Sequence, residues 1–343
     1  MTPSTVIAPR VLVTGANGFI GRHLRRTLSA RGFDHRGAVR ALRAATAATA
    51  ATVGDDGDVG DGGDDPHTCV VGDLQSSTDW SSALEGVDVV VHLAARAHVM
   101  AETAVNPEAE FMRVNAAGTA ALVAAAVAAG VRRFVYVSSI GVLGSHSADT
   151  PFNAASMPRP HNAYTRSKLA GELAARAAAA RLEVVILRLP LVYGPGVRAN
   201  FLRLLRWIDQ GRPLPLGAVH NRRSLLNVWN LCDLIVNVVL NPAAPGGTWL
   251  VSDGEDVSTP ELIRLIGAAM GRRVRLLAVP VVWLQWMGRL AGRQALITQL
   301  CGTLSLDIAR TRDQLRWAPP VSVEEALART VSWYLAAASS LEL

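Results

Sequence analysis

A tyrosine and a lysine stand four residues apart in the segment NAYTRSKLAGE, and a serine ends the earlier segment RRFVYVSS. Because Tyr164 and Lys168 open a helical pattern, we expect both side chains on one helix face. A phenol with an ordinary pKa near 10 is a poor base, but a neighbouring ammonium favours the phenolate. Lys168 is the only lysine among 34 basic residues. The pattern predicts that Tyr164 exchanges a proton with a substrate oxygen that Ser139 holds.

The elements that must position these side chains are short strands alternating with helices. The strand-like runs are RVLVT, HRGAVRA, TCVVGDL, DVVVHLA, RRFVYVSS and EVVILRL. Strands that are apolar on both faces and alternate with helices predict an α/β fold with a doubly wound parallel sheet. Ser139 then lies at the carboxyl end of the fifth strand, where ligands bind in such sheets.

A glycine array lies between the first predicted strand and the first predicted helix. The segment VTGANGFIG contains Gly15, Gly18 and Gly21. Glycine permits a tight turn and lets the backbone approach a pyrophosphate, which then sits at a helix N-terminus. The strand before the array and the helix after it complete the context that this motif requires. The array therefore predicts a dinucleotide site.

The end of the second strand bears on the choice of dinucleotide. Sites that prefer NAD usually carry an acidic residue there, but this chain has Val39 followed by Arg40. Arg40 favours NADP(H) modestly, because its guanidinium matches the 2′-phosphate, although it could equally stack on adenine. Asp73 could bind the adenine amino group, or be a helix N-cap or turn residue. Ala94 and Ala95 offer small side chains where the cofactor could pass.

Composition narrows the class of protein. The 343 residues are half hydrophobic, with a net charge of +6 and a pI of about 9.9. The absence of a basic block argues against nucleic acid, and three distant cysteines suggest neither disulfides nor a metal site. The apolar runs fall short of a membrane span, so we expect no transmembrane segment and a cytoplasmic location. Residues 41–66 are predicted to form a low-complexity surface loop rather than a calcium site.

The motifs together resemble an extended short-chain dehydrogenase/reductase of the nucleotide-sugar epimerase/dehydratase branch. They are VTGANGFIG, HLAA, VNAAGT, VSS and YTRSK. The resemblance implies a Rossmann domain, a nicotinamide cofactor and a catalytic set of Ser139, Tyr164 and Lys168, with Lys168 also contacting the nicotinamide ribose. The residues expected to bind the cofactor are Gly15, Asn17, Gly18, Phe19, Ile20, Gly21, Arg40, Asp73, Leu74, Leu93, Ala94, Ala95, Asn115, Tyr164 and Lys168.

The resemblance also implies a smaller, mainly helical C-terminal lobe that binds a nucleoside-diphosphate sugar. Residues 1–189 and 224–252 are assigned to the Rossmann domain, and 190–223 and 253–340 to the lobe. Ser139, Asn200 and Arg223 are expected to contact the sugar nucleotide, although Arg223 could be a plain surface arginine. The run VRLLAVPVVWLQWMGRLAGRQALITQL could be an interfacial membrane helix, but a buried or lid-forming helix is the more common explanation.

Two residues after the serine bear on the reaction. The 4,6-dehydratases of this family carry an acidic pair directly after the catalytic hydroxyl, whereas this chain has Ile140 and Gly141. Redox at C4 of a UDP-sugar remains, with a modest preference for reduction of a UDP-4-keto-(6-deoxy)-N-acetylhexosamine in surface-polysaccharide synthesis. The alternatives are a UDP-glucose or UDP-GlcNAc 4-epimerase and a non-catalytic cofactor sensor. The family also implies a homodimer through helices near 107–130 and 161–181.

Overall fold

Seven parallel strands form the central sheet of the computed structural model, which describes residues 8–42, 67–97, 106–147, 150–292 and 294–339. The strand order is β3-β2-β1-β4-β5-β6-β9. In that order the strands are Thr68–Val70, His35–Val39, Val11–Thr14, Val89–His92, Arg133–Ser139, Glu183–Leu189 and Thr248–Leu250. The order reverses beside β1, which creates the ligand-binding crevice of a doubly wound sheet. The predicted Rossmann fold is confirmed. The predicted loop lies almost wholly outside the described residues.

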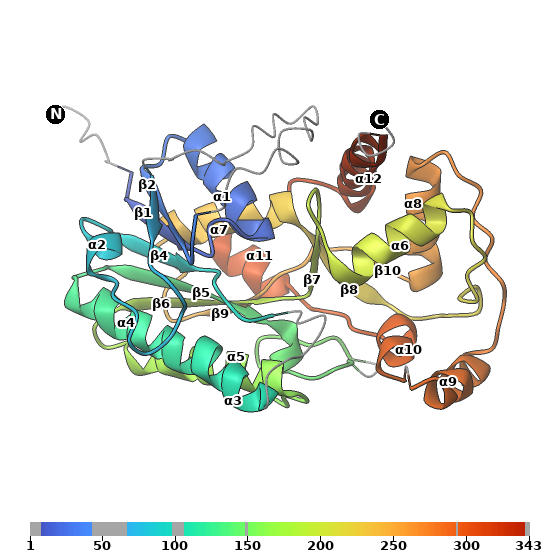
Figure 1. The fold of residues 1–343 in the computed structure, drawn as a ribbon, viewed down its shortest axis with the longest axis horizontal. Helices are drawn as coiled ribbons and strands as arrows, with labels where there is room; N and C mark the ends of the chain where they lie inside the picture. The colour runs from blue at the N-terminus through green and yellow to red at the C-terminus, as the bar shows by residue number, and fades with distance from the viewer. Residues whose placement is uncertain (1–7, 43–66, 98–105, 148–149, 293, 340–343) are drawn as a thin grey trace.

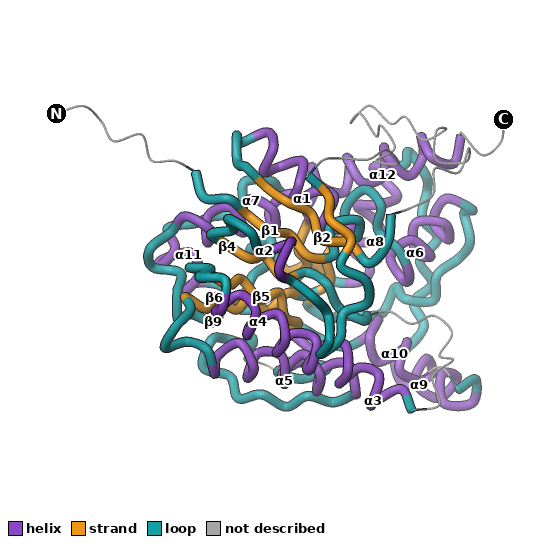
Figure 2. Tube along the Cα trace, turned by 60° about the vertical axis from the view of Figure 1, so that its left-hand side comes forward, coloured by secondary structure: helices purple, strands orange, loops and turns teal. Residues whose placement is uncertain are grey.

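Helices cover both faces of this sheet (Figures 1 and 2). One layer contains α1 (Phe19–Ala30), α7 (Val228–Leu240) and α11 (Ala309–Leu315), and the other contains α2 (Ser81–Leu84), α4 (Gly118–Ala128) and α5 (Ala163–Ala177). Successive strand residues point to opposite faces, so Val11 and Val13 join the first core while Leu12 joins the second. Both faces of the strands are therefore buried, which explains their continuous apolar sequences.

One long helical run precedes β5. It consists of α3 (Pro107–Phe111), a π-helical segment (Met112–Ala117) and α4. Within the described residues, Pro107–Ala128 is the one helix long and apolar enough to cross a membrane by length and composition. However, α4 packs against α5, and Leu122, Val123 and Ala126 are buried in the core beside the sheet. These contacts make it a core helix of the sheet layer.

A second region lies beyond the carboxyl edge of the sheet. Its three-stranded sheet has the order β10-β8-β7, with strands Asp256–Val257, Arg223–Asn227 and Leu191–Tyr193. The helices around it are α6 (Ala199–Asp209), α8 (Thr259–Ala269), α9 (Val281–Leu290), α10 (Gln294–Cys301) and α12 (Val323–Ser339). Although β8 belongs to the small sheet, the next elements, α7 and β9, belong to the large one. The domain limits drawn from the sequence stay a prediction.

The helix α9 differs from its expected environment. Its only buried residues are Leu284 and Gly288, and most of its apolar side chains are exposed. Of the two common explanations, a buried helix is therefore wrong, and a lid-forming helix stays a prediction. The sequence showed that the segment is apolar but not which side of it faces the core.

Candidate functional site

Ser139 and Tyr164 meet at the carboxyl end of β5. Ser139 is the last residue of the strand, and its Oγ accepts a hydrogen bond from the Gly141 amide at 3.2 Å. A capping box at Asn162 and Thr165 fixes the start of α5, which places Tyr164 in its first turn. The Tyr164 hydroxyl lies close enough to Ser139 for the serine to favour its ionised form. The structure thus brings together the serine and the tyrosine that the sequence singled out.

Lys168 lies one turn further along α5 and is buried. Its Nζ stands 4.2 Å from the ring centroid of Tyr136 on β5. Burial lowers the pKa of Lys168 to about 7, and the negative charge of Glu172 acts in the opposite direction. An ammonium with this pKa can lose or keep its proton near neutrality.

The tyrosine departs from the expectation drawn from the sequence. Burial raises the pKa of Tyr164, and the nearby Ser139 hydroxyl offsets only part of that rise. The predicted lowering by Lys168 is therefore not seen in the protein alone. The reason is that removing a phenolate from water costs more than the nearby groups return.

A buried carboxylate stands behind the site. Glu172 accepts hydrogen bonds from Ser138 Oγ at 2.6 Å and from both Nε and an Nη of Arg188, at 2.9 and 2.7 Å. Because neighbouring strand residues point to opposite faces, Ser138 binds this ion pair while Ser139 faces the site. Glu172 follows Lys168 by four residues, so the series Tyr164, Lys168, Glu172 lies along one side of α5. Sequence reasoning missed this role, although the spacing was a usable signal.

Asn115 joins the loop after β4 to α5. It is buried in the π-helical segment, a local widening that is frequent at functional sites. Its Oδ1 accepts from the Arg96 amide at 2.7 Å, while its Nδ2 donates to the Arg96 carbonyl and to Ser167 Oγ, both at 3.0 Å. These contacts join the β4 loop to α5 through Asn115, and its expected role in cofactor binding stays a prediction.

A buried histidine ties the same region to β1. His92 Nδ1 is 2.7 Å from Thr14 Oγ1, and its Nε2 is 2.9 Å from Thr119 Oγ1. Thr14 Oγ1 also accepts from the Ala94 amide, and Thr119 Oγ1 donates to the Asn115 carbonyl. Burial lowers the pKa of His92 to about 3, with a smaller effect from Lys168. The neutral ring therefore holds the loop at Ala94 in place, a role that the HLAA motif alone did not reveal.

The glycine loop has the geometry that a pyrophosphate requires. Gly15 adopts φ +67°, and a Cβ there would lie 3.0 Å from the Ala94 backbone. A Cβ on Gly21 would collide with the Gly15 carbonyl. The first turn of α1 carries no acidic residue, and Gly18 offers no side-chain cap, so its N–H groups remain available to an anion. These residues fit a dinucleotide.

The other expected cofactor residues border the same edge. Phe19 lies beneath the loop after β7, because Cβ atoms on Gly194 and Gly196 would come within 3.7 and 3.6 Å of its ring. Leu74 packs against α4 at Gly118. Those that surround the β1 and β4 loops are Asn17, Ile20, Leu93, Ala94 and Ala95. None of these assignments is tested by a bound ligand, and they stay predictions.

Arg40 and Asp73 form a loose pair just beyond β2 and β3. Arg40 Nε is 3.7 Å from Asp73 Oδ1, and both side chains are mostly exposed. Asp73 is in a turn, where its carbonyl accepts from Thr78 Oγ1, so it is not a helix N-cap. Val39 is buried at the end of β2. At this edge of the sheet Asp73 therefore holds Arg40 only weakly, as is usual for ion pairs at the surface.

Two of the three expected substrate residues, Asn200 and Arg223, contact α10. Asn200 is exposed at the start of α6, and its Nδ2 donates to Gln299 Oε1 at 3.2 Å. The Arg223 guanidinium donates to the carbonyls of Gln299 and Gly302, and burial lowers its pKa. Arg223 is therefore not a plain surface arginine, because the end of α10 holds its head group.

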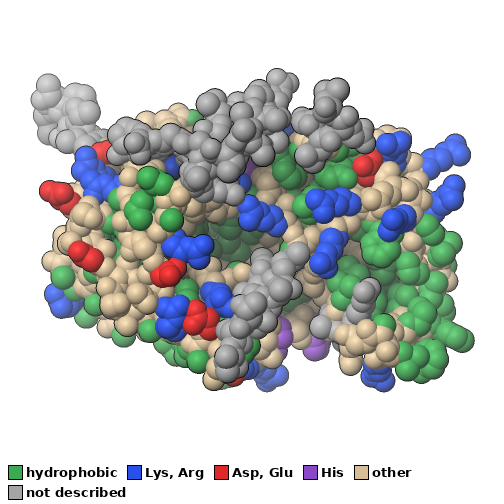
Figure 3. Space-filling view, viewed as in Figure 1, with side chains coloured by type: hydrophobic (Ala, Val, Ile, Leu, Met, Phe, Trp, Pro, Cys, Tyr) green, Lys and Arg blue, Asp and Glu red, His purple; other side chains and the backbone are tan. Residues whose placement is uncertain are grey.

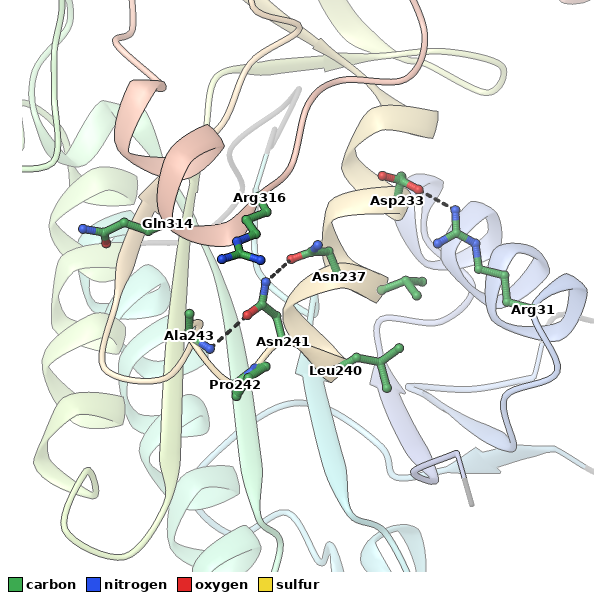
Figure 4. A pocket seen from close by; sticks show the side chains of 10 residues that line it. Arg31, Asp233, Asn237, Leu240, Asn241, Pro242, Ala243, Gln314 and Arg316 are labelled. Atoms are coloured by element: carbon green, nitrogen blue, oxygen red, sulfur yellow. Dashed lines mark hydrogen bonds and ion pairs between the residues drawn. The ribbon is translucent and has the colours of Figure 1, made fainter. Parts of the chain in front are cut away.

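A cavity of about 690 Å³ lies away from all these residues, between α7 and the ends of α1 and α11 (Figure 4). Arg31 and Asp233 form an ion pair at one side of it, and Asn241 lies at the other. The turn at Asn241 precedes β9, so the cavity faces the amino ends of the strands. Ligands of doubly wound sheets bind at the opposite edge, so this cavity is not the cofactor site. No cluster of metal-binding side chains occurs among the described residues.

The comparisons with known proteins agree on a family. Residues 11–251 match the model of the NAD dependent epimerase/dehydratase family. A UDP-glucose 4-epimerase of Vibrio cholerae is 38% identical over 332 residues, which cover 95% of this chain and 96% of that protein. Among solved structures, MoeE5 in complex with UDP-glucuronic acid and NAD is 26% identical, with a TM-score of 0.69 and coverage of 96% and 99%.

A further neighbour supports the fold alone. The NAD complex of a UDP-glucuronic acid 4-epimerase from Bacillus cereus has a TM-score of 0.72 at 21% identity, covering 94% of this chain and 98% of that one. The family model spans more than half of the chain, and the relative from Vibrio cholerae spans nearly all of it. The chain therefore belongs to the NAD-dependent epimerase/dehydratase family of the short-chain dehydrogenase/reductase superfamily.

Proposed function

We propose that this protein carries out oxidoreduction at C4 of a UDP-sugar, with Tyr164 as the proton carrier. The observation that carries the proposal is the assembly of Ser139, Tyr164 and Lys168 at the carboxyl end of β5, with no titratable side chain at positions 140 and 141. A Cβ at Gly141 would lie 2.7 Å from Thr165 Cγ2. The site therefore lacks both the groups and the room for a separate acid and base, which argues against dehydration.

The residues divide the work as follows. A bound nicotinamide supplies or accepts the hydride at C4. Tyr164 gives a proton to the C4 oxygen, or takes it, while Ser139 holds that oxygen by a second hydrogen bond. Lys168 binds the nicotinamide ribose and, when charged, stabilises the phenolate. Asn200 and Arg223 hold the sugar nucleotide, with the guanidinium on the diphosphate.

Two outcomes are compatible with this chemistry. Net reduction of a UDP-4-keto-(6-deoxy)-N-acetylhexosamine in surface-polysaccharide synthesis is favoured by the cofactor edge, where Arg40 stands in place of an acidic residue. Epimerisation at C4 is favoured by the relative from Vibrio cholerae, which is named as a UDP-glucose 4-epimerase. The family is NAD-dependent, and the preference of this chain for NADP(H) stays a prediction that rests on Arg40 alone.

A pair of assays separates the outcomes. One follows oxidation of NADH and of NADPH with a UDP-4-keto sugar, and the other follows interconversion of UDP-glucose with UDP-galactose, and of their N-acetyl forms, without added cofactor. Consumption of reduced cofactor without interconversion supports the reductase, and interconversion without consumption supports the epimerase. Cofactor binding with neither activity contradicts catalysis at C4 and favours the cofactor sensor.

The substitution Tyr164→Phe tests the proton carrier. We expect turnover to fall by about 10²-fold to 10⁴-fold while cofactor affinity stays nearly unchanged, because only the hydroxyl is lost. Tyr334→Phe is a matched control, since it removes a hydroxyl that binds Asp209 on the far side of the lobe. An active Tyr164→Phe protein would remove the tyrosine from the mechanism.

A further inference from the structure

The helix α9 presents an apolar face to solvent. Five of its ten residues are large apolar side chains that are between 45% and 72% exposed. They are Val282, Trp283, Trp286, Met287 and Leu290. At about 100° per residue they fill an arc of roughly 140° without a polar interruption, while Leu284 and Gly288 on the other side face the core. Figure 3 shows hydrophobic side chains gathered where Figure 1 places α9.

The charged residues in the chain segment that contains this face are all basic. From residue 262 to residue 306 the chain contains no Asp or Glu but contains six arginines. Arg289 lies on α9 at the border of the apolar arc, and Arg273 and Arg275 are exposed in the loop that leads to the helix. Within the described part of the chain, these three form no ion pair, whereas Arg272 is held by Asp209 at 3.4 Å.

We propose that α9 docks this protein on an anionic membrane surface. A helix with tryptophans on one face and basic residues beside it lies in the plane of the interface, where apolar burial and attraction to anionic lipid add together. A second copy is a poorer occupant, because a two-fold contact through α9 would bring two acid-free, arginine-rich segments together. A zwitterionic surface has no net negative charge to attract the arginines.

The docking face is separate from the residues expected to bind the sugar nucleotide. α9 packs against α10, whose end accepts hydrogen bonds from Arg223 and Asn200, and none of the exposed apolar residues of α9 is among those expected to contact the sugar nucleotide. The proposal therefore stands whether or not the proposed reaction is correct.

Co-sedimentation with vesicles tests the docking. Full-length protein is mixed with one of two kinds of vesicle. One contains phosphatidylcholine alone, and the other also contains phosphatidylglycerol at about 30%, which makes its surface strongly anionic. We expect binding to the anionic vesicles only, weakening as salt rises. Equal binding to both kinds of vesicle, or to neither, would overturn the proposal.

Matched variants locate the contact. Trp283→Gln combined with Trp286→Gln should lower the partition coefficient at least about tenfold, whereas Trp207→Gln, at an exposed tryptophan of α6, should not change it. Arg289→Glu should lower it about fivefold or more, and Arg181→Glu, at an exposed arginine outside the segment, should do so far less.

Two controls keep these results decisive. The circular dichroism melting temperature should be the same for all four variant proteins, because the substituted side chains are exposed. If light scattering instead finds a dimer that the double tryptophan variant alone abolishes, and vesicle binding is unaffected, α9 is a contact between copies and the membrane proposal is wrong.

Discussion

The side chains proposed to be catalytic depend on a buried carboxylate behind them. Glu172 lies one turn beyond Lys168, neutralises Arg188 and fixes Ser138, the residue before the proposed catalytic serine. Its charge also keeps the pKa of Lys168 from falling further than burial alone would take it. Glu172 thus positions the strand end and sets the protonation of the lysine together.

The substitution Glu172→Gln should separate these effects. Without the carboxylate the pKa of Lys168 drops below about 7. As pH rises, the variant then loses the ammonium, and the activity that needs it, at a lower pH than the native protein does. We expect the alkaline limb of the pH profile of kcat/KM to move to lower pH. Arg188 is also left unpaired, at a cost in unfolding free energy of about 3–5 kcal/mol. Glu183→Gln, at a partly exposed carboxylate that pairs with the buried Arg133, is the control, and an unmoved alkaline limb would limit Glu172 to a structural role.

At the scale of elements, the position of α5 depends on the absence of a side chain at Gly171. A Cβ at Gly171 would collide with the Tyr136 hydroxyl and lie 2.9 Å from the Asn115 carbonyl. The helix can therefore approach β5 and the π-helical segment closely only because this residue is glycine. That approach brings the Lys168 ammonium over the Tyr136 ring.

Gly171→Ala should consequently harm activity from a distance. The added methyl forces α5 outward, at a cost of about 1–3 kcal/mol in stability, and shifts Lys168 away from β5. We expect a lower melting temperature together with a lower kcat, although helix propensity alone would favour alanine. A more stable, fully active Gly171→Ala protein would show that the helix has room to move.

The features that could be predicted from the sequence are those formed by residues that lie close together in the chain. Gly15, Gly18 and Gly21 lie within seven residues, and Ser139 ends an apolar run, so the loop and strand end could be placed without a structure. Glu172 with Arg188 and Ser138, or His92 with Thr14 and Thr119, depend on segments that only the fold brings together. The exposure of α9 could not be predicted, because the apolar composition of a segment does not show whether its side chains face the core or the solvent.

The whole molecule should be sensitive to acid through His92. The pKa of this buried ring is lowered to about 3, so in the folded state it stays neutral while the unfolded chain binds a proton near the ordinary value of 6.5. The unfolded state thus binds more protons as pH falls, and stability is lost progressively from about pH 6.5 downward. Each pH unit in this window costs up to about 1.4 kcal/mol.

The unfolding free energy of the native protein and of His92→Gln, measured between pH 4 and 7, checks this. The variant should be less stable at pH 7 but show a flatter acid slope, whereas His220→Gln, at an exposed histidine, should match the native protein. Parallel slopes for His92→Gln and the native protein would contradict the assignment. The slope of each variant should be compared with that of the native protein, because Asp253 also titrates in this range. Burial raises the pKa of Asp253 to about 6, so its protonation stabilises the folded state as pH falls and partly masks the effect of His92.

The arginine-rich segment around α9 also explains the basicity of the chain. The six arginines between residues 262 and 306 equal the net charge of +6, and the remaining 28 basic residues are balanced by 28 acidic residues. The rest of the sequence therefore has no formal net charge near pH 7, and the high isoelectric point comes from this segment. On a cation-exchange resin, replacing those arginines alone should let the protein pass through unretained.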